Sequence, residues 1–162
     1  MINAKMETVD TLRTYKAPFA KRRCLVPADG FYEWKPTGLK RKQPYRFVLN
    51  SGDIFYFAGL WENSKDADGN PIRTYTILTT TPNSLVQPVH NRMPVILRPE
   101  LHQEWLAPEA TTPRLKESPA LLERIKPAEA SDPPMMGIEV EITESEPAAG
   151  DACQLIFEFC GY

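Results

Sequence analysis

With 162 residues, the chain fits one domain that can bury a hydrophobic core. Its 42% hydrophobic and 25% charged residues are ordinary for a water-soluble globular protein, and no apolar run approaches the roughly 20 residues of a membrane span. Residues 1–50 carry 11 Lys and Arg against 4 Asp and Glu, whereas residues 98–162 carry 5 against 13. The basic N-terminal region favours a phosphate-bearing partner, with an ordinary solvated face as the alternative.

Sixteen prolines divide the chain into short elements, which disfavours a helical bundle. Residues 4–15 are predicted to form a short helix that ends before Pro18. Arg23–Val26 and Phe31–Trp34 are predicted strands on either side of a turn at Pro27–Gly30.

Two hairpins are predicted in the middle of the chain. Tyr45–Leu49 and Ile54–Trp61 are rich in aromatic and β-branched residues, and the turn residues Asn50–Asp53 join them. The second hairpin pairs Phe55–Trp61 with Thr74–Thr80 across a polar loop.

The remaining elements are short. Pro94–Leu97 is a predicted strand, Glu100–Leu106 and Pro119–Lys126 are predicted helices, and Gly137–Ile142 and Leu155–Phe159 are further strands. The pattern predicts an α+β fold: a curved, mostly antiparallel, barrel-like β-sheet with short peripheral helices, in one domain over residues 1–162.

The most informative stretch is Val89–Val95, which contains one of the two histidines of the chain. His90 lies two residues from Arg92, and an apolar run follows that should anchor both. Because histidine titrates near neutrality and passes protons in either direction, His90 is a candidate catalytic residue. A packing or capping role is the alternative.

Cations and aromatic rings alternate around the first two strands. Lys21–Arg23 precede one strand, Lys35 and residues 40–42 follow the next, and Phe31, Tyr32 and Trp34 lie between them. This combination is typical of single-stranded nucleic acid binding. Because strand side chains alternate, Phe31 and Glu33 share one face and the other two rings share the opposite face, so at least one ring belongs to the core.

Three further positions are candidates for chemistry or binding. Glu33 lies between aromatic residues, and a glutamate in an apolar pocket can act as a general acid or base, with a surface charge as the alternative. Asn3 is a candidate for holding a sugar or an oxyanion, or a cap residue. The hydroxyls of Thr79–Thr81 suit phosphate contacts or a simple strand end.

Together these residues resemble the SOS response-associated peptidase (SRAP) family of abasic-site processing proteins. Five blocks carry the resemblance, in the family's order: Ile2–Thr8, Arg22–Trp34, Ala58–Trp61, Thr76–Thr80 and His90–Pro94. The match is strongest over residues 2–106. The segment 127–162 is divergent and matches no family ending that we can trace.

The resemblance implies a DNA-damage protein that binds single-stranded DNA with abasic sites as a cytoplasmic, nucleoid-associated monomer in a bacterium, without metal or cofactor. Family members have autoproteolytic peptidase activity and capture the ring-opened sugar with an N-terminal cysteine, forming a thiazolidine crosslink. By position, the catalytic residues are Asn3, Glu33 and His90. The DNA path would be lined by Lys5, Arg22, Arg23, Trp34, Thr80 and Arg92.

One departure from the family concerns the nucleophile. Family members carry the cysteine at position 2, several dozen residues before the block that starts here at Ile2. Cys24 lies in an apolar strand and is expected to be buried, and the three uneven cysteines suit a reducing cytosol. We expect a truncated chain that binds DNA but does not crosslink to it, or else a degenerate member of the family.

Two other functions stay open. A peptidase acting on protein substrates would use His90 and Glu33, but the second histidine, His102, lies in a polar helix and no serine is placed to complete a nucleophile pair. In a non-catalytic nucleic-acid-binding or protein-interaction module, the same two residues would be structural.

Overall fold

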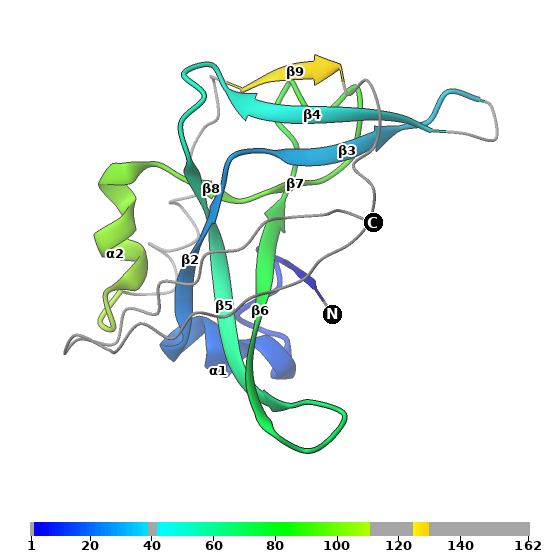
Figure 1. Cartoon of the computed structure of the whole chain (residues 1–162). Coiled ribbons are helices and arrows are strands. Elements are labelled where there is room, and N and C mark those ends of the chain that lie inside the picture. Colours follow the sequence, from blue (N-terminus) through cyan, green and yellow to red (C-terminus); the bar gives the residue numbers. More distant parts are fainter. Residues whose placement is uncertain (1, 39–41, 111–124, 130–162) are drawn as a thin grey trace.

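The computed structural model describes residues 2–38, 42–110 and 125–129 (Figure 1). Strands dominate and the helices are short, which confirms the predicted α+β fold with a curved, mostly antiparallel sheet. In chain order the elements are β1 (Asn3–Lys5), α1 (Arg13–Lys21), β2 (Arg23–Ala28), β3 (Phe31–Lys35), β4 (Gln43–Leu49), β5 (Phe55–Lys65), β6 (Pro71–Thr80), β7 (Met93–Pro94), β8 (Ile96–Leu97), the 3-10 helix η1 (Pro99–Leu101), α2 (His102–Leu106) and β9 (Ile125–Glu129).

The strands form two sheets whose directions cross (Figure 1). The larger sheet has the order β1-β6-β5-β2, with β7 paired to β6 and β8 paired to β5. The smaller sheet has the order β3-β4-β9. All pairings are antiparallel except that of β1 with β6, which is parallel.

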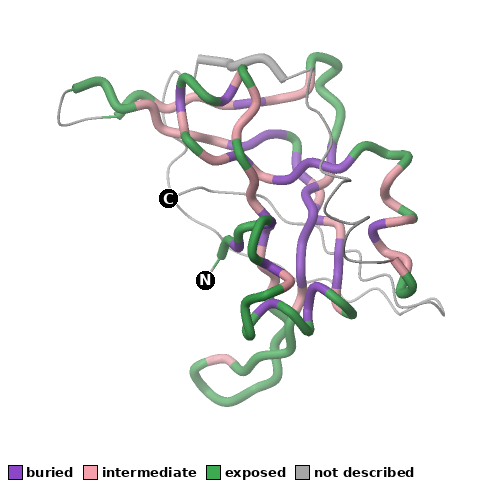
Figure 2. Tube along the Cα trace, turned by 180° about the vertical axis from the view of Figure 1, so that it is seen from behind, coloured by how far each residue is buried: buried purple, intermediate pink, exposed green. Residues whose placement is uncertain are grey.

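The larger sheet is buried on both faces. In β5, Phe55 and Phe57 point into a first core toward the smaller sheet, whereas Ala58 and Leu60 point into a second core. Helices α1 and α2 cover the second core with Phe19 and Trp105, among others. The buried backbone runs through the middle of the molecule, and the far end of the β5–β6 hairpin is exposed (Figure 2).

The predicted helix over residues 4–15 is wrong. Asn3–Lys5 instead form β1, with Ala4 buried between two exposed neighbours, and the helix begins only at Arg13. Its buried residues Tyr15, Pro18 and Phe19 have helical spacing, so the helix includes the proline that was expected to follow it. Packing of this stripe outweighs the hydrogen bond that a proline inside a helix removes.

One predicted hairpin is confirmed and the other is wrong. β5 and β6 pair antiparallel from Gly59 opposite Ile77 to Lys65 opposite Pro71. The turn after β4 exists, with Gly52 at φ 75° and its N–H donating to the Leu49 carbonyl at 3.0 Å. However, the strand that follows, β5, belongs to the larger sheet. β4 pairs with β3 and β9 and not with β5, so no hairpin forms here.

The C-terminal predictions are only partly testable. The predicted helix at Glu100–Leu106 is confirmed as η1 followed by α2. The predicted strands Gly137–Ile142 and Leu155–Phe159 lie outside the described residues, as does most of the predicted helix Pro119–Lys126, whose last two residues instead begin β9. In the described part of the chain, no helix is long and apolar enough to cross a membrane.

A buried cation joins the two helices to β2. The side chain of Arg23 is only 8% exposed, and its guanidinium donates to four backbone carbonyls. These belong to Trp105 at 2.6 Å, Phe19 at 2.7 Å, Ala20 at 2.8 Å, and Ala107. The carbonyls at the ends of α1 and α2 have no partner within their own helices, so one planar fork satisfies both helix ends.

Arg23→Lys is therefore expected to lower the free energy of unfolding by at least about 2 kcal/mol, because an ammonium group cannot reach four carbonyls at once. Urea unfolding of both proteins would measure this difference. The control is Lys21→Arg, the reverse exchange at an exposed neighbour in α1, which should leave stability unchanged. Equal stability of Arg23→Lys and the parent protein would contradict this role.

Candidate active site

The segment that carries His90 is anchored between two strands. Beyond Ile77, β6 separates from β5, and the segment of β7 and β8 fills the gap. At its centre, the Val95 N–H donates to the Leu78 carbonyl and the Val95 carbonyl accepts from the Ala58 N–H, both at 2.8 Å. The apolar run after His90 is buried, as the sequence predicted.

The loop before His90 is also fixed. The side-chain oxygen of Asn83 accepts from the N–H groups of Leu85 and Val86 at 3.2 and 3.0 Å. The His90 N–H then donates to the Val86 carbonyl at 3.0 Å, while Val86 and Val89 are buried in the first core. Local capping and apolar packing therefore determine where the imidazole lies.

Glu33 and His90, 57 positions apart in the sequence, meet at this point. The Glu33 Oε2 and His90 Nδ1 atoms are 3.4 Å apart. Glu33 shares a face of β3 with Phe31, as the alternation in the sequence predicted. Because Phe31 is buried in the first core, this face brings Glu33 to the imidazole. Its side chain is only 18% exposed, whereas that of His90 is 41% exposed.

The two ring nitrogens of His90 have different surroundings. Nδ1 faces the Arg92 carbonyl at 3.1 Å and the Glu33 carboxyl, and the Arg92 N–H lies at 3.2 Å. Nδ1 therefore faces two acceptor oxygens, from Arg92 and Glu33, and one donor, the Arg92 N–H. This balance favours the tautomer with the proton on Nδ1. Nε2 makes no hydrogen bond within the described part of the chain, so its lone pair is available to a ligand.

Burial raises the pKa of Glu33 above its ordinary value, and the nearby His90 opposes that rise when it is charged. A carboxyl group whose pKa is raised by burial, in contact with an imidazole, is a pair that can donate and accept protons. General acid–base chemistry is therefore the reaction type that this geometry supports.

Arg92 has a partner that the sequence analysis missed. Its guanidinium binds the Glu7 carboxylate with two parallel hydrogen bonds of 2.7 and 2.8 Å, and it also donates to the Thr79 carbonyl at 2.6 Å. The Arg92 backbone contacts His90 Nδ1, so this ion pair connects the residue after β1 to the loop of the imidazole. Glu7 belongs to the first family-like block, but its pairing with a residue 85 positions away has no local signal.

Asn3 and Lys5 lie on the same side of the larger sheet as this site. β1 runs parallel to β6 with Asn3 opposite Ile77 and Lys5 opposite Thr79. Ile77 belongs to the first core, so Asn3 and Lys5 flank its edge, while Ala4 turns to the second core. Thr79 contacts Arg92, which places Lys5 beside the Arg92–His90 loop.

Comparison with known proteins identifies the family of the chain. The family model described as SOS response associated peptidase (SRAP) matches residues 1–139. The chain belongs to the SRAP family. The family motifs in the sequence end at residue 106. The match to the family model extends further, into the first part of the segment 127–162 that the motifs left as divergent.

Individual SRAP relatives match the chain over part of their length. The abasic site processing proteins YoqW and YoaM of Bacillus subtilis are 48% and 45% identical over 113 residues, covering 70% of this chain and 50% of each relative. A crystal structure from Bacteroides thetaiotaomicron matches with a TM-score of 0.71 at 30% identity, over 77% of this chain and 56% of that one. The SRAP chain thus spans about half the length of these curated relatives.

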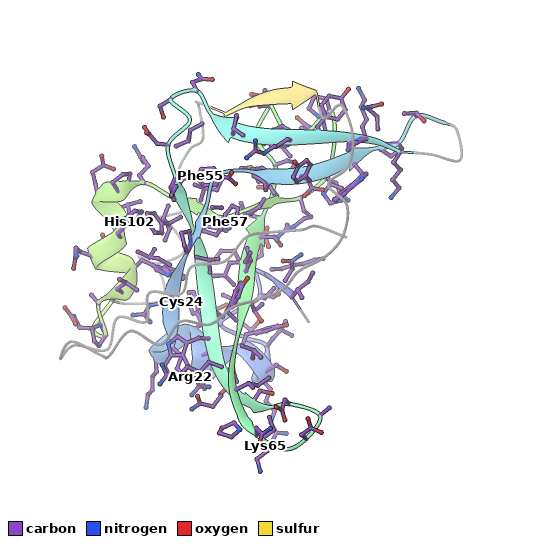
Figure 3. The ribbon with its side chains drawn as sticks, viewed as in Figure 1. Arg22, Cys24, Phe55, Phe57, Lys65 and His102 are labelled. Atoms are coloured by element: carbon purple, nitrogen blue, oxygen red, sulfur yellow. The ribbon has the colours of Figure 1, made fainter. Side chains whose placement is uncertain are left out.

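Several positions that the resemblance assigned to DNA binding are not gathered at the Glu33–His90 pair. Arg23 is buried and committed to the helix ends. Arg22 lies at the lower end of the larger sheet, paired with Glu62 at 2.5 Å (Figure 3). Alternation turns Trp34 to the opposite face of β3 from Glu33, where its ring lies 6.4 Å from that of Tyr32.

Thr80, another position assigned to DNA binding, and the second histidine also lie away from the Glu33–His90 pair. Alternation turns Thr80 to the opposite face of β6 from Thr79, which is the hydroxyl beside Arg92. The second histidine, His102, lies on α2 against Tyr56, on the far side of the larger sheet (Figure 3). The candidate site therefore centres on the contact between Glu33 and His90, with Arg92, Glu7 and Thr79 linked to it by hydrogen bonds and with Asn3 and Lys5 on the neighbouring strand β1.

Glu33→Gln is expected to change the pH dependence of stability. Because the pKa of Glu33 is raised on folding, the folded state holds this proton more tightly, and the free energy of unfolding falls as pH rises from about 4.5 through the folded pKa. The variant loses this dependence, so its stability relative to the parent should increase over that window. Urea unfolding between about pH 4 and pH 8 measures the difference. Performing it in a His90→Gln background isolates the carboxyl group, and a difference constant with pH would refute the assignment.

Glu7→Gln is expected to loosen the imidazole while costing less than about 1 kcal/mol of stability, since Glu7 is 44% exposed. The Arg92 hydrogen bond lowers the pKa of Glu7, so this cost is present above about pH 4.5 and disappears as pH falls through the folded pKa. Imidazole NMR spectra supply the second readout. The His90 ring signals should shift while those of His102, the internal control, stay in place; unmoved His90 signals would show that the ion pair does not position the ring.

Proposed function

We propose that this SRAP chain binds single-stranded DNA and acts on abasic sites in the DNA damage response. The observation that carries the proposal is the contact between Glu33 and His90, a proton-transfer pair formed by two family-like blocks. Lys5 and Asn3 flank it with a cation and a carboxamide, which suit a phosphate and a sugar hydroxyl. In a bacterial cell such a protein would work in the cytoplasm on the nucleoid, and one site per chain suits a monomer.

The chemistry of an abasic sugar fits such a pair. The sugar exists mainly as a closed ring with a hydroxyl at C1′. Opening it removes the proton of that hydroxyl, forms the C1′ carbonyl, breaks the bond from C1′ to the ring oxygen and delivers a proton to that oxygen. Nε2 of His90 is the exposed base, and the Nδ1 side, toward Glu33, is where the resulting positive charge is stabilised.

The recessed position of Glu33 favours single-stranded DNA over duplex DNA. The carboxyl group faces the core between the two sheets. A sugar must leave a stacked duplex to reach such a position, and this extrusion costs energy that a flexible single strand does not require.

Binding of an abasic site and crosslinking to it require different groups of the protein. The thiol within the described residues is Cys24, which is 4% exposed. No hydroxyl or thiol side chain of the described residues hydrogen-bonds His90, so a peptidase nucleophile beside the imidazole has no support here either. The described residues are therefore expected to bind and open the abasic sugar without themselves supplying an accessible thiol for a crosslink.

A labelled single-stranded oligonucleotide with one abasic site tests the proposal. The protein should bind it in a salt-sensitive manner and bind the matching duplex more weakly. It should also accelerate capture of the aldehyde by an excess of an alkoxyamine. His90→Ala should reduce this acceleration by roughly 10²- to 10⁴-fold while keeping fold and affinity, and His102→Ala is the matched control.

Three results would count against it. Unchanged mobility of the oligonucleotide at low salt would remove DNA binding. A shifted band that survives heating in denaturant would show that the chain does crosslink. Equal acceleration by His90→Ala and the parent protein would remove the catalytic role of the imidazole.

A further inference from the structure

We infer that the projecting end of the β5–β6 hairpin is a second contact element for single-stranded DNA, separate from the Glu33–His90 site. The inference rests on the proposed DNA binding and adds a surface that the sequence analysis did not identify. The hairpin extends beyond the neighbouring strands β1 and β2 of the larger sheet, and Lys65 lies near its tip (Figures 1 and 3).

One face of this hairpin collects cations and flat rings. Trp61 pairs with Tyr75 and Asn63 pairs with Arg73 in the antiparallel register, so their side chains share a face, and Lys65 follows on the same side. The same face continues along β6 to Ile77 and across to Asn3 in β1. The hairpin surface is therefore continuous with the side of the sheet that carries the proposed active site.

The rings on this face are held in place. Trp61 and Tyr75 are half-buried and pack against the first core, and the Arg73 guanidinium lies 5.4 Å from the centre of the Trp61 ring. A ring that packing has already ordered loses little freedom when a base stacks on it. Beside it, the two strands form an open pocket of about 610 Å³. Its lining residues are Asn63, Ser64, Lys65, Pro71, Ile72 and Arg73.

Two of the three acidic residues of the hairpin, Glu62 and Asp66, are turned away or engaged, and the third, Asp68, is exposed in the turn beyond the strands. Glu62 is on the opposite face of β5 from Trp61 and forms an ion pair with Arg22. The Asp66 carboxylate folds into the turn, where it accepts from the N–H groups of Asp68 and Asn70 at 2.9 and 2.8 Å. Positive charge beside aromatic rings, with the nearest carboxylates occupied, is complementary to a nucleic acid backbone with exposed bases.

Distance determines which ligands would use this surface. Arg73 and Thr79 are six residues apart in β6, which corresponds to roughly 20 Å along a strand. A very short oligonucleotide held at Glu33 and His90 cannot also reach the hairpin, whereas a longer one can. The hairpin should therefore add affinity only for longer single strands.

The test compares two abasic single strands, one of about six nucleotides and one of about twenty. The double variant Lys65→Glu/Arg73→Glu should weaken binding of the long strand about tenfold and leave the short strand unaffected. The matched control is Arg13→Glu/Lys16→Glu, the same charge change on exposed positions of α1, across the sheet. As a second variant, Trp61→Leu should weaken long-strand binding roughly tenfold, and Trp61→Phe should retain it.

The outcomes distinguish this inference from the function on which it rests. If the parent protein binds both strands and the hairpin variant loses no more long-strand affinity than the control, the second contact element is refuted and the proposed function stands. If the parent binds neither strand, both are refuted. A loss confined to the long strand and to the hairpin variants supports the inference.

Discussion

The insertion of Val95 between β5 and β6 is the constraint on which the rest of the site depends. Where two neighbouring strands of a sheet separate, they leave unpaired N–H and C=O groups. Burying such unpaired groups costs free energy. Here the backbone of Val95 satisfies both sides, accepting from Ala58 and donating to Leu78. Because His90 lies five residues before this insertion, the hydrogen bonds that close the sheet also fix the position of the imidazole.

At Glu33, burial and the charge of the neighbouring imidazole shift the pKa in opposite directions. The core face of β3 disfavours the ionised form of Glu33, and a protonated imidazole favours it. Burial thus raises the pKa of Glu33, while the contact with His90 keeps the carboxyl group beside a second group that can carry a proton. Arg92 and Glu7 form an ion pair beside this pair of residues and orient the loop, so that their charges cancel locally and do not bias the proton strongly in either direction.

The sequence predicted most strands and the central pair of the site, and its errors have physical causes. Apolar spacing between residues 4 and 15 resembled a helix, but Ala4 and Met6 are buried as a strand and a turn because β6 offers a parallel edge. The turn at Gly52 was predicted correctly, but the residues of a turn do not determine which sheet the next strand joins. The choice between Thr79 and Thr80 required knowing which face of β6 carries Arg92, since both faces of this strand are covered.

Hydrogen bonds and ion pairs between distant segments were the hardest features to predict from the sequence. Arg23 looked like a surface cation within a basic cluster, and only the packing of two helix ends against β2 reveals its buried role. The pairing of Glu7 with Arg92 likewise joins segments that no periodicity connects. In contrast, strand alternation alone placed Glu33 on the same face as Phe31, and the burial of Phe31 in the structure identifies that face as the core face.

The attachment of β1 has a consequence for the dynamics of the site. β1 is three residues long, lies at the edge of its sheet and is held to β6 by a parallel ladder, whereas His90 is anchored in the middle of the same sheet. Such an edge opens locally at a small fraction of the free energy that global unfolding requires. Asn3 and Lys5 should therefore exchange their amide protons far sooner than the strands that hold Glu33 and His90. The native ensemble would then contain molecules in which the proton-transfer pair is intact but the groups that would hold its ligand have moved away.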